Sequence, residues 1–337
     1  VHAGFSDAEY TEAGATLSSD TDALLGGADI VLRVNKPALE DIKKVKRGAL
    51  HISYLDPYNE AELIDAMAAQ GVSSVSMEMI PRTTRAQKMD ALSSQASLAG
   101  YSMVLLAANK LGRILPMMMT PAGTLKPARV FVIGAGVAGL QAIATAKRLG
   151  AKVDAFDTRP VVAEQVQSLG AKFVNIDLGE MGQTEGGYAK ELTPEQLELQ
   201  RLGMKDIISQ SDIVITTAQL FGRPAPRIIT KDMVEAMKPG GVIVDMAVGS
   251  GGNVEGSVPD ETVVINGVSI IGVANLPSET AQDASQMYSS NLFNLVTEYW
   301  NEETKTFNLN LEDDILKGCV ITHDGEIVNT AIKNLRT

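Results

Sequence analysis

The 337-residue sequence predicts an α/β protein with two doubly wound parallel-sheet domains, separated by a cleft and joined by long helices. Three observations support this fold class. Strand-like apolar segments alternate with helical ones, a glycine-rich turn follows one such segment near the middle of the chain, and two long helical patterns flank the second half of the alternation. This alternation is typical of parallel sheets whose strands are connected by helices.

The first domain is predicted from the alternation in the N-terminal third. Strand-like segments at residues 30–34 and 75–79 flank a helical pattern at residues 60–70, which indicates a βαβ layer. A mostly apolar helical pattern at residues 93–111 is long enough to connect two domains. The chain begins with Val1 rather than Met, so we interpret its N-terminus as truncated.

A domain boundary is expected at residues 115–127, which contain three prolines and a glycine. We interpret the methionines at residues 117–119 as packing filler at this junction rather than as a binding surface. The second domain is predicted at residues 125–275, with strands near 130–133, 173–176, 213–216, 242–246 and 269–273. A helical pattern at residues 280–300 returns the chain, so the first domain comprises residues 1–120 plus 278–337.

The glycine-rich turn predicts a dinucleotide-binding site in the second domain. Gly134, Gly136 and Gly139 have G-x-G-x-x-G spacing directly after a strand and at the start of a helix. This pattern permits a tight turn, close approach of the backbone to a pyrophosphate, and close packing of helix and strand. Asp157 follows at the end of the next strand, where a carboxylate binds ribose hydroxyls and favours NAD(H) over NADP(H). Arg159, two residues further on, could instead accommodate a 2′-phosphate, and an ordinary structural turn is the alternative to a Rossmann-like site.

Two polar loops are further candidates. Arg82, Arg85, Gln87, Asp90 and Ser93 follow a predicted strand and could orient a carboxamide-bearing ring by hydrogen bonds. The alternative is a helix N-terminus capped by Asp and Ser, with solvated arginines. The glycine-rich loop at residues 179–192 is either a mobile lid or a flexible crossover.

Composition excludes several classes of function. The net charge of −12 disfavours nucleic acid as a partner. No apolar run approaches the ~20 residues of a membrane span, so direct membrane insertion is not expected. The single cysteine, Cys319, lies in a strand-like run and is interpreted as packing, and the three histidines are too scattered for a metal site.

Several motifs together resemble the NAD(H)-binding domain of the proton-translocating NAD(P) transhydrogenase family. They are R-x-x-R-A-Q-x-x-D-x-x-S-S from Arg82, G-A-G-V-A-G-L-Q-A-I-A-T-A-K-R-L-G from Gly134, F-D-T-R-P from Phe156, G-G-Y-A-K-E from Gly186 and G-R-P-A-P from Gly222. The resemblance extends over essentially the whole chain. The family's opening strand and its R-V-A segment are absent before Val1, which predicts that the first sheet lacks a piece.

The resemblance implies two sets of site residues and no metal. The catalytic set is Arg82, Gln87, Asp90 and Ser93. The cofactor-binding set is Arg82, Thr83, Thr84, Gln87, Lys88, Met89, Asp90, Gly134, Ala135, Gly136, Val137, Gly139, Asp157, Thr158, Arg159, Gly187, Tyr188, Ala218 and Gln219. Tyr188 matches the tip of the family's mobile loop, which favours the lid. The segment around Gln219 reads T-T-A-Q-L-F-G where the family usually has T-T-A-L-I-P-G, so its contacts are less well supported by the resemblance.

The resemblance also implies a reaction and partners. The expected reaction is direct hydride transfer between NAD(H) on this chain and NADP(H) on a partner domain, coupled to proton translocation by a membrane-spanning domain. Such a transfer needs positioning and exclusion of water rather than a general base. A homodimer is expected, as is a soluble protein peripheral to the cytoplasmic face of a bacterial inner membrane, or to the matrix side in an organelle.

Two alternatives remain. Alanine dehydrogenase, a relative with the same two-domain plan, needs a catalytic lysine and histidine where this chain has Asn35 and Asp56. A non-catalytic NAD-binding regulatory module would share the glycine turn and Asp157 but would have no use for the loop at residues 82–93.

Overall fold

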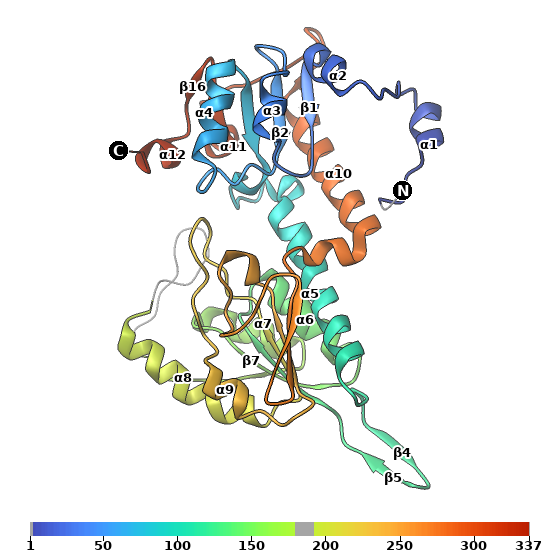
Figure 1. Ribbon diagram of the computed structural model, residues 1–337, viewed down its shortest axis with the longest axis vertical. Helices are drawn as coiled ribbons and strands as arrows, with labels where there is room; N and C mark the ends of the chain where they lie inside the picture. Colours follow the sequence, from blue (N-terminus) through green and yellow to red (C-terminus); the bar gives the residue numbers. More distant parts are fainter. Residues whose placement is uncertain (1–2, 179–191, 337) are drawn as a thin grey trace. The chain divides into compact units, whose positions relative to one another are not determined.

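The computed structural model describes residues 3–178 and 192–336, which form two compact units (Figure 1). One unit comprises Val1–Gln95 and Ala281–Thr337, and the other comprises Ala96–Thr280. The sequence places the boundary near residues 120–125, whereas the units divide inside the long helix α5 (Ala91–Lys110). The reason is packing, because Ala99, Met103 and Ala107 of this helix are buried in the core of the second unit.

The second unit contains a doubly wound sheet. Among its described residues, seven strands pair in the order β11-β12-β10-β9-β6-β7-β8. They are β6 (Arg129–Ile133), β7 (Lys152–Phe156), β8 (Lys172–Phe173), β9 (Ile213–Thr216), β10 (Val242–Asp245), β11 (Glu261–Ile265) and β12 (Val268–Gly272). All neighbouring pairs are parallel except β11 and β12. Without the antiparallel edge strand β11, the order is that of a Rossmann fold.

Alternating side chains of these strands bury the two faces of the sheet against different helices. Val130 and Val132 of β6 share a core cluster with residues of α5 and of α6 (Val137–Arg148). Phe131 and Ile133 share the opposite cluster with residues of α8 (Pro194–Ser209) and α9 (Lys231–Glu235). The period of two follows from strand geometry, and burial of both faces explains the nearly continuous apolar sequence of β6. The other helical elements of this unit are η3 (Pro160–Val162), α7 (Ala163–Ser168), η4 (Val248–Ser250) and η5 (Leu276–Thr280).

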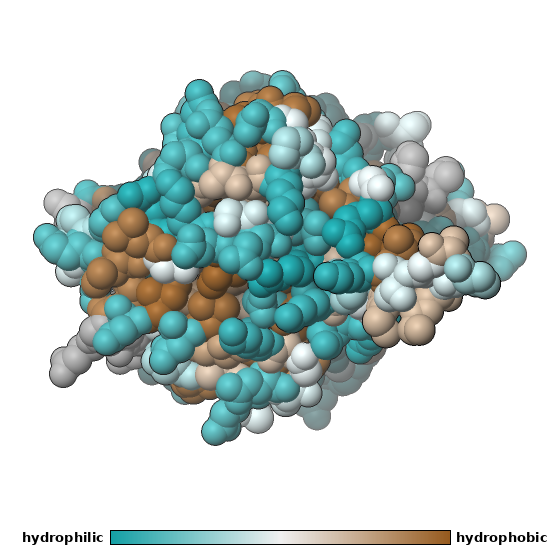
Figure 2. Space-filling model, turned by 90° about the horizontal axis from the view of Figure 1, so that it is seen from below, coloured by the Kyte–Doolittle hydropathy of each residue, from teal (hydrophilic) through white to brown (hydrophobic). Residues whose placement is uncertain are grey.

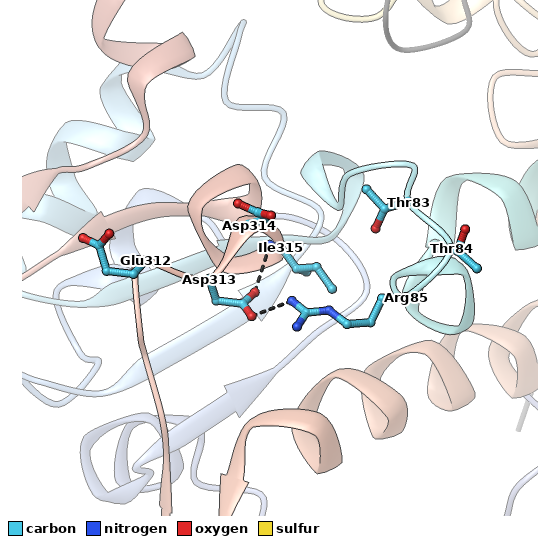
Figure 3. A pocket seen from close by; sticks show the side chains of 7 residues that line it. All are labelled: Thr83, Thr84, Arg85, Glu312, Asp313, Asp314 and Ile315. Atoms are coloured by element: carbon cyan, nitrogen blue, oxygen red, sulfur yellow. Dashed lines mark hydrogen bonds and ion pairs between the residues drawn. The ribbon is translucent and has the colours of Figure 1, made fainter.

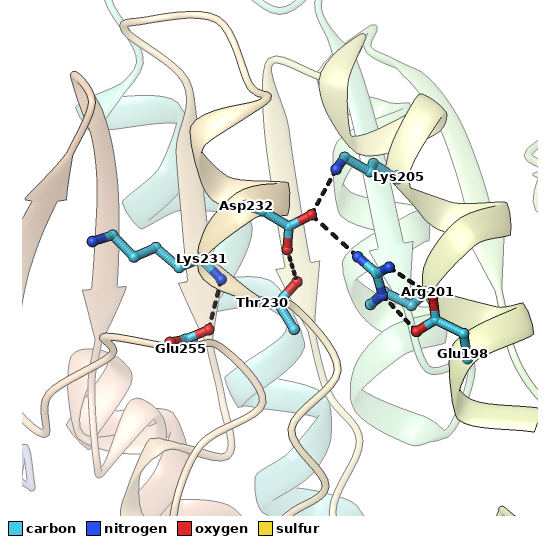
Figure 4. Close-up of polar contacts among 7 residues, drawn as sticks. All are labelled: Glu198, Arg201, Lys205, Thr230, Lys231, Asp232 and Glu255. Atoms are coloured by element: carbon cyan, nitrogen blue, oxygen red, sulfur yellow. Dashed lines mark hydrogen bonds and ion pairs between the residues drawn. The ribbon is translucent and has the colours of Figure 1, made fainter. Parts of the chain in front are cut away.

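Charged side chains connect α8 to α9 on the surface of this unit (Figure 4). Asp232 accepts hydrogen bonds from Lys205 at 2.6 Å, from Arg201 at 3.1 Å and from the hydroxyl of Thr230 at 2.5 Å. The hydrogen bonds from Lys205 and Thr230 lower the pKa of Asp232 to about 2. These exposed ion pairs orient the helices but contribute little to the free energy of unfolding.

The first unit contains a mixed sheet. Its described strands are β1 (Ile30–Leu32), β2 (Leu50–Ser53), β3 (Ser73–Ser76), β15 (Val320–His323) and β16 (Glu326–Ile327), in that order. The strands β1, β2 and β3 are parallel, as predicted, but β15 and β16 are antiparallel to their neighbours. The departure from an all-parallel sheet has a local cause, because the C-terminal segment enters the sheet as a hairpin beside β3.

Helices cover both faces of this sheet. One core cluster joins Leu50 and Val75 to α10 (Ala281–Tyr299) and α11 (Asp314–Cys319), and another joins α3 (Leu39–Ile42), α4 (Ala61–Gln70) and α12 (Thr330–Asn334). Cys319 ends α11 rather than lying in a strand, and burial raises the pKa of its thiol to about 12. The remaining elements are α1 (Asp7–Glu12), α2 (Thr21–Gly27), η1 (Met77–Met79), η2 (Gln87–Met89), β13 (Trp300–Asn301) and β14 (Thr306–Phe307).

The methionine run is exposed, which corrects the expectation of packing filler. It lies on a hairpin of β4 (Met118–Thr120) and β5 (Gly123–Leu125) that projects from the second unit (Figure 1). Met119 is 74% exposed and Leu125 is 53% exposed. Seen from that end, the surface carries brown apolar side chains between the hydrophilic ones (Figure 2).

By length and composition alone, α5 could cross a membrane, contrary to the expectation that the chain has no such run. Met103 and Ala107 of this helix are completely buried inside the second unit. We therefore assign α5 as a core helix.

A candidate dinucleotide-binding site

The three glycines after β6 have three different structural roles. Gly134 has a φ of +96°, a conformation that favours glycine, and it makes the tight turn at the end of the strand. A Cβ on Gly139 would lie 1.9 Å from the carbonyl oxygen of Gly134, so only glycine permits this approach of helix to strand. A Cβ on Gly136 would have only the Nη2 of Arg159, at 4.0 Å, within contact range. The space above Gly136 is thus the part of the turn that a ligand's pyrophosphate could fill.

The turn lies at a topological switch point. The strands β6 and β9 are neighbours, but the chain continues from β6 to β7 on one side and from β9 to β10 on the other. Ligands of doubly wound sheets bind at the carboxyl ends of such strands. Gly136 is also the N-cap residue of α6, so the N-cap position offers no side chain to the first amide groups of this helix. Those amide groups and the helix dipole favour a phosphate.

Asp157 lies directly beside the turn. Its Oδ2 accepts the backbone N–H of Ala135 at 2.7 Å and the Nη2 of Arg159 at 2.8 Å. Its Oδ1 accepts the backbone N–H of Arg159 at 2.8 Å and the Nε of the same residue at 2.9 Å. Two N–H groups on each oxygen fill the carboxylate's capacity, so a ribose hydroxyl could donate to Asp157 only by replacing one of them. Thr158 lies between the two partners and is partly buried.

The segment after β9 forms a second wall at this sheet edge. Ala218 is partly buried and Gln219 is exposed. The side chain of Asn253 accepts the N–H of Ala218 at 3.1 Å and donates to its carbonyl at 2.8 Å. The buried carboxylate of Asp245 in turn accepts the N–H of Asn253 at 3.2 Å. Asn253 and Asp245 were not identified from the sequence, because these contacts join positions distant in the chain and leave no local pattern.

The other candidate residues lie in the first unit, between β3 and α5. Arg82, Thr83, Thr84, Gln87 and Lys88 are exposed. Met89, in contrast, is completely buried in the core cluster of this unit. Its role is therefore to anchor the segment, which corrects its assignment as a residue that touches the cofactor.

Asp90 and Ser93 begin helix α5. Asp90 accepts the backbone N–H of Ser93 at 2.9 Å and its hydroxyl at 2.6 Å. This is the capping geometry that the alternative interpretation of the loop predicts. Each oxygen of Asp90 retains capacity for a further hydrogen bond, so capping and ligand binding are compatible.

Arg85 is not solvated, as that alternative expected, but paired with the C-terminal part of the chain (Figure 3). Its Nη2 lies 2.5 Å from the Oδ2 of Asp313, and the hydroxyl of Tyr299 donates to the Oδ1 of Asp313 at 2.8 Å. Burial opposes ionisation of Asp313, but the hydrogen bonds from Arg85 and Tyr299 outweigh it and lower its pKa. A cavity of about 520 Å³ lies here, lined by Thr83, Thr84, Arg85, Glu312, Asp313, Asp314 and Ile315.

The predicted site residues thus form two groups. The residues from Gly134 to Arg159, with Ala218 and Gln219, lie at one sheet edge of the second unit, and the residues from Arg82 to Ser93 lie in the first. Gly187 and Tyr188, with the proposed lid, lie outside the described residues. Three glycines with distinct roles, a carboxylate after the second strand and a Rossmann strand order define a dinucleotide-binding protein of the dehydrogenase class.

Comparison with known proteins identifies the family. Residues 1–99 match the N-terminal domain, and residues 103–330 match the C-terminal domain, of the alanine dehydrogenase/PNT family. The chain belongs to this family.

Three similar proteins are transhydrogenases. The chain is 46% identical to NAD(P) transhydrogenase subunit alpha of Cereibacter sphaeroides over 97% of its own length and 63% of that relative's. It is 44% identical to an NAD(P) transhydrogenase subunit alpha protein of Rhodospirillum rubrum, over 98% and 88% of the two lengths. A crystal structure of transhydrogenase from Sinorhizobium meliloti, 42% identical, covers 98% of this chain and is itself covered to 87%, with a TM-score of 0.83. The chain is therefore an oxidoreductase component whose Rossmann unit takes a nicotinamide dinucleotide.

Proposed function

We propose that this chain is the NAD(H)-binding component of a proton-translocating NAD(P) transhydrogenase. The observation that carries the proposal is the glycine turn, in which Gly136 leaves space where a pyrophosphate would lie. The similarity to transhydrogenase alpha subunits over nearly the whole chain supports the reaction type. The chain spans 63% of the length of the Cereibacter relative. Proton translocation is accordingly assigned to parts of the complex beyond this chain.

In this proposal the second unit holds most of the dinucleotide. The backbone of Gly134, Ala135 and Gly136, with Val137 at the start of α6, binds the pyrophosphate, and Gly139 keeps that helix close. Asp157 accepts hydrogen bonds from the adenosine ribose and repels a 2′-phosphate, which selects NAD(H). Arg159, whose guanidinium lies near Gly136, moves from Asp157 toward the pyrophosphate when the ribose replaces it. Thr158, Ala218 and Gln219 complete the adenosine side, and Tyr188 with Gly187 forms a lid.

The first unit contributes the residues that orient the reacting ring. Arg82, Gln87, Asp90 and Ser93 hold the carboxamide by hydrogen bonds, with Thr83, Thr84 and Lys88 beside them. The bound nicotinamide supplies the hydride chemistry, so these side chains need to position groups and exclude water rather than move a proton. The rigid support of the segment by Met89 and by the Arg85–Asp313 pair is consistent with that role.

The alternative activity, alanine dehydrogenase, is not supported by the residues at its expected site. Asn35 and Asp56 stand where a lysine and a histidine are needed. The neighbouring Lys36 forms ion pairs with Asp56 and Glu60, and the hydrogen bond to Glu60 raises its pKa. A lysine held in this way remains charged and is a poor acid–base catalyst at neutral pH. A regulatory module without catalysis would not explain the supported segment at residues 82–93.

The proposed partners are an NADP(H)-binding domain, a membrane-spanning proton-channel domain and a second copy of this chain. The exposed hairpin of β4 and β5 supports the homodimer, because Met118, Met119 and Leu125 together present an apolar surface on a projecting element. The proposed location is the cytoplasmic face of a bacterial inner membrane, or the matrix side in an organelle.

The proposal is tested by mixing the chain with a purified NADP(H)-binding domain and following reduction of an NADP⁺ analogue by NADH. We expect Gln87→Asn, which moves the amide by one methylene at an exposed position, to slow transfer about tenfold or more. The dissociation constant for NADH should change less than about twofold, because the second unit provides most of the binding. Gln165→Asn, also at an exposed position, is the matched control. Equal losses of transfer and NADH affinity in Gln87→Asn would contradict the assigned role.

A further inference from the structure

The segment that carries Asp90 and Ser93 is held from both sides by one side chain of helix α10. The Nδ2 of Asn291 donates to the backbone carbonyl of Lys88 at 3.0 Å. The Oδ1 of the same amide accepts the hydroxyl of Ser94 at 2.7 Å. Asn291 therefore spans residues 88–94, with Asp90 and Ser93 between its two contacts.

The position of Asn291 on its helix requires an explanation. The buried residues of α10 are Tyr288, Asn291, Leu295 and Tyr299, so the asparagine lies within an otherwise aromatic and aliphatic stripe. It is only 6% exposed. A buried amide is unfavourable unless its donor and acceptor are both satisfied, and here both are used on the segment at residues 88–94.

Other contacts fix the same segment but do not replace Asn291. Asn294, one turn further along α10, also donates to the carbonyl of Lys88, at 3.2 Å, but it is less buried and shares its amide with the carbonyl of Ser290. Lys88 forms an ion pair with Glu298 at 2.7 Å between the ends of long side chains at the surface. Asn291 is the contact that joins the two flanks of Asp90 directly.

We propose that Asn291 is a positioning residue for hydride transfer, a role that rests on the proposed function of the chain. By fixing the carbonyl of Lys88 and the hydroxyl of Ser94, it holds the backbone that presents Gln87 and Asp90. It touches neither the dinucleotide nor the reacting atoms. Its loss leaves the glycine turn and Asp157 unchanged, because these lie in the second unit.

The first test compares Asn291→Ala with Asn308→Ala, an exposed asparagine of the same unit. Transfer from NADH to an NADP⁺ analogue on a partner domain should fall at least about tenfold in Asn291→Ala, because small displacements of positioning groups have large effects on rate. The dissociation constant for NADH should stay within about twofold of the wild type, and Asn308→Ala should match the wild type in both. Unchanged transfer, or a loss of transfer that only parallels a loss of NADH affinity or of folded protein, would overturn the proposal.

The second test uses Asn291→Asp, which keeps the acceptor for Ser94 but replaces the donor by a carboxylate. A buried carboxyl has a raised pKa, and once protonated it can again donate to the carbonyl of Lys88. Transfer by this variant, divided by that of the wild type at the same pH, should therefore rise as the pH falls. A ratio that is independent of pH would contradict a role for this hydrogen bond.

A third measurement separates this proposal from the proposed function. Hydrogen–deuterium exchange of the isolated chain should be faster in Asn291→Ala across residues 86–95, where the N–H groups of Met89 and Asp90 bond to Ala86 and Gln87. If the wild type transfers no hydride, the proposed function fails, yet exchange still tests whether Asn291 holds the segment. Exchange at residues 86–95 equal to that of the wild type would overturn the positioning role.

Discussion

Substituting the second glycine of the turn should separate binding from folding. Gly136 has φ −78° and ψ −165°, an extended conformation that alanine adopts without strain. A Cβ there would meet only Arg159, at 4.0 Å. Alanine is a poorer N-cap residue than glycine, by roughly 0.5 kcal/mol, but it lowers the entropy of the unfolded chain by a similar amount. Gly136→Ala should therefore change the free energy of unfolding by less than about 1 kcal/mol.

The same methyl group occupies the space assigned to the pyrophosphate. We expect the dissociation constant of NADH to rise at least about tenfold, or about 1.4 kcal/mol, because the phosphates can no longer approach the backbone. The measurements are urea denaturation and a fluorescence titration with NADH. Gly112→Ala, at an exposed glycine with nothing within 4 Å, is the matched control.

Gly139→Ala should behave in the opposite way. Its Cβ would lie 1.9 Å from the carbonyl oxygen and 2.8 Å from the carbonyl carbon of Gly134, so helix and strand must separate. We expect a destabilisation of about 3 kcal/mol or more from this overlap. Wild-type affinity for NADH in a stable Gly136→Ala protein would refute the assignment of the pyrophosphate to this turn.

Two further predictions concern charge. Asp157→Ala should weaken NADH binding about tenfold and reduce discrimination against NADPH, because it removes the ribose acceptor and leaves Arg159 beside the glycine turn; titrations with both nucleotides measure this. Burial, with a smaller contribution from the charge of Arg33, lowers the pKa of His51 to about 4, so this histidine stays neutral in the fold while the unfolded chain binds a proton below pH 6.5. Stability should therefore fall by up to about 3 kcal/mol as the pH drops from 6.5 to 4, and His51→Gln should lose this part of the fall in urea denaturation.

Each of these has a clear contrary outcome. Retained NADH affinity and selectivity in Asp157→Ala would count against its role at the ribose. For His51, other groups also titrate in acid, so only the difference between variant and wild type is informative. Parallel stability curves of His51→Gln and wild type between pH 4 and 7 would show that the buried imidazole, whose Nε2 has no hydrogen-bond partner among the described residues, does not titrate in this range.

The parts of the fold that the sequence predicts are those with strong local patterns. The strand at residues 213–216 and the turn from Gly134 to Gly139 have signals contained within a few residues, and the structure has them where expected. Two hairpins were missed although local signals exist. Asn266-Gly267 between β11 and β12, and Asp324-Gly325 between β15 and β16, have the positive φ angles of tight hairpin turns. Recognising them would have predicted the antiparallel strands of both sheets.

Other features could not be predicted because their causes are non-local. The amide of Asn291 meets a carbonyl 203 residues away, and Arg85 meets Asp313 across 228 residues. Nothing near either position in the sequence signals these contacts, which only the topology of the first unit creates. The exposure of Met119 has the same explanation, because composition cannot distinguish a core methionine from one on a projecting hairpin.

Following the transferred hydrogen itself tests the proposed reaction most sharply. NADH labelled with deuterium at C4, on the side that is transferred, is mixed with this chain and an NADP(H)-binding domain that carries an NADP⁺ analogue. We expect the reduced analogue to carry the full label, with none reaching water. Label in the solvent, or an unlabelled reduced product, would contradict direct transfer between two nucleotides.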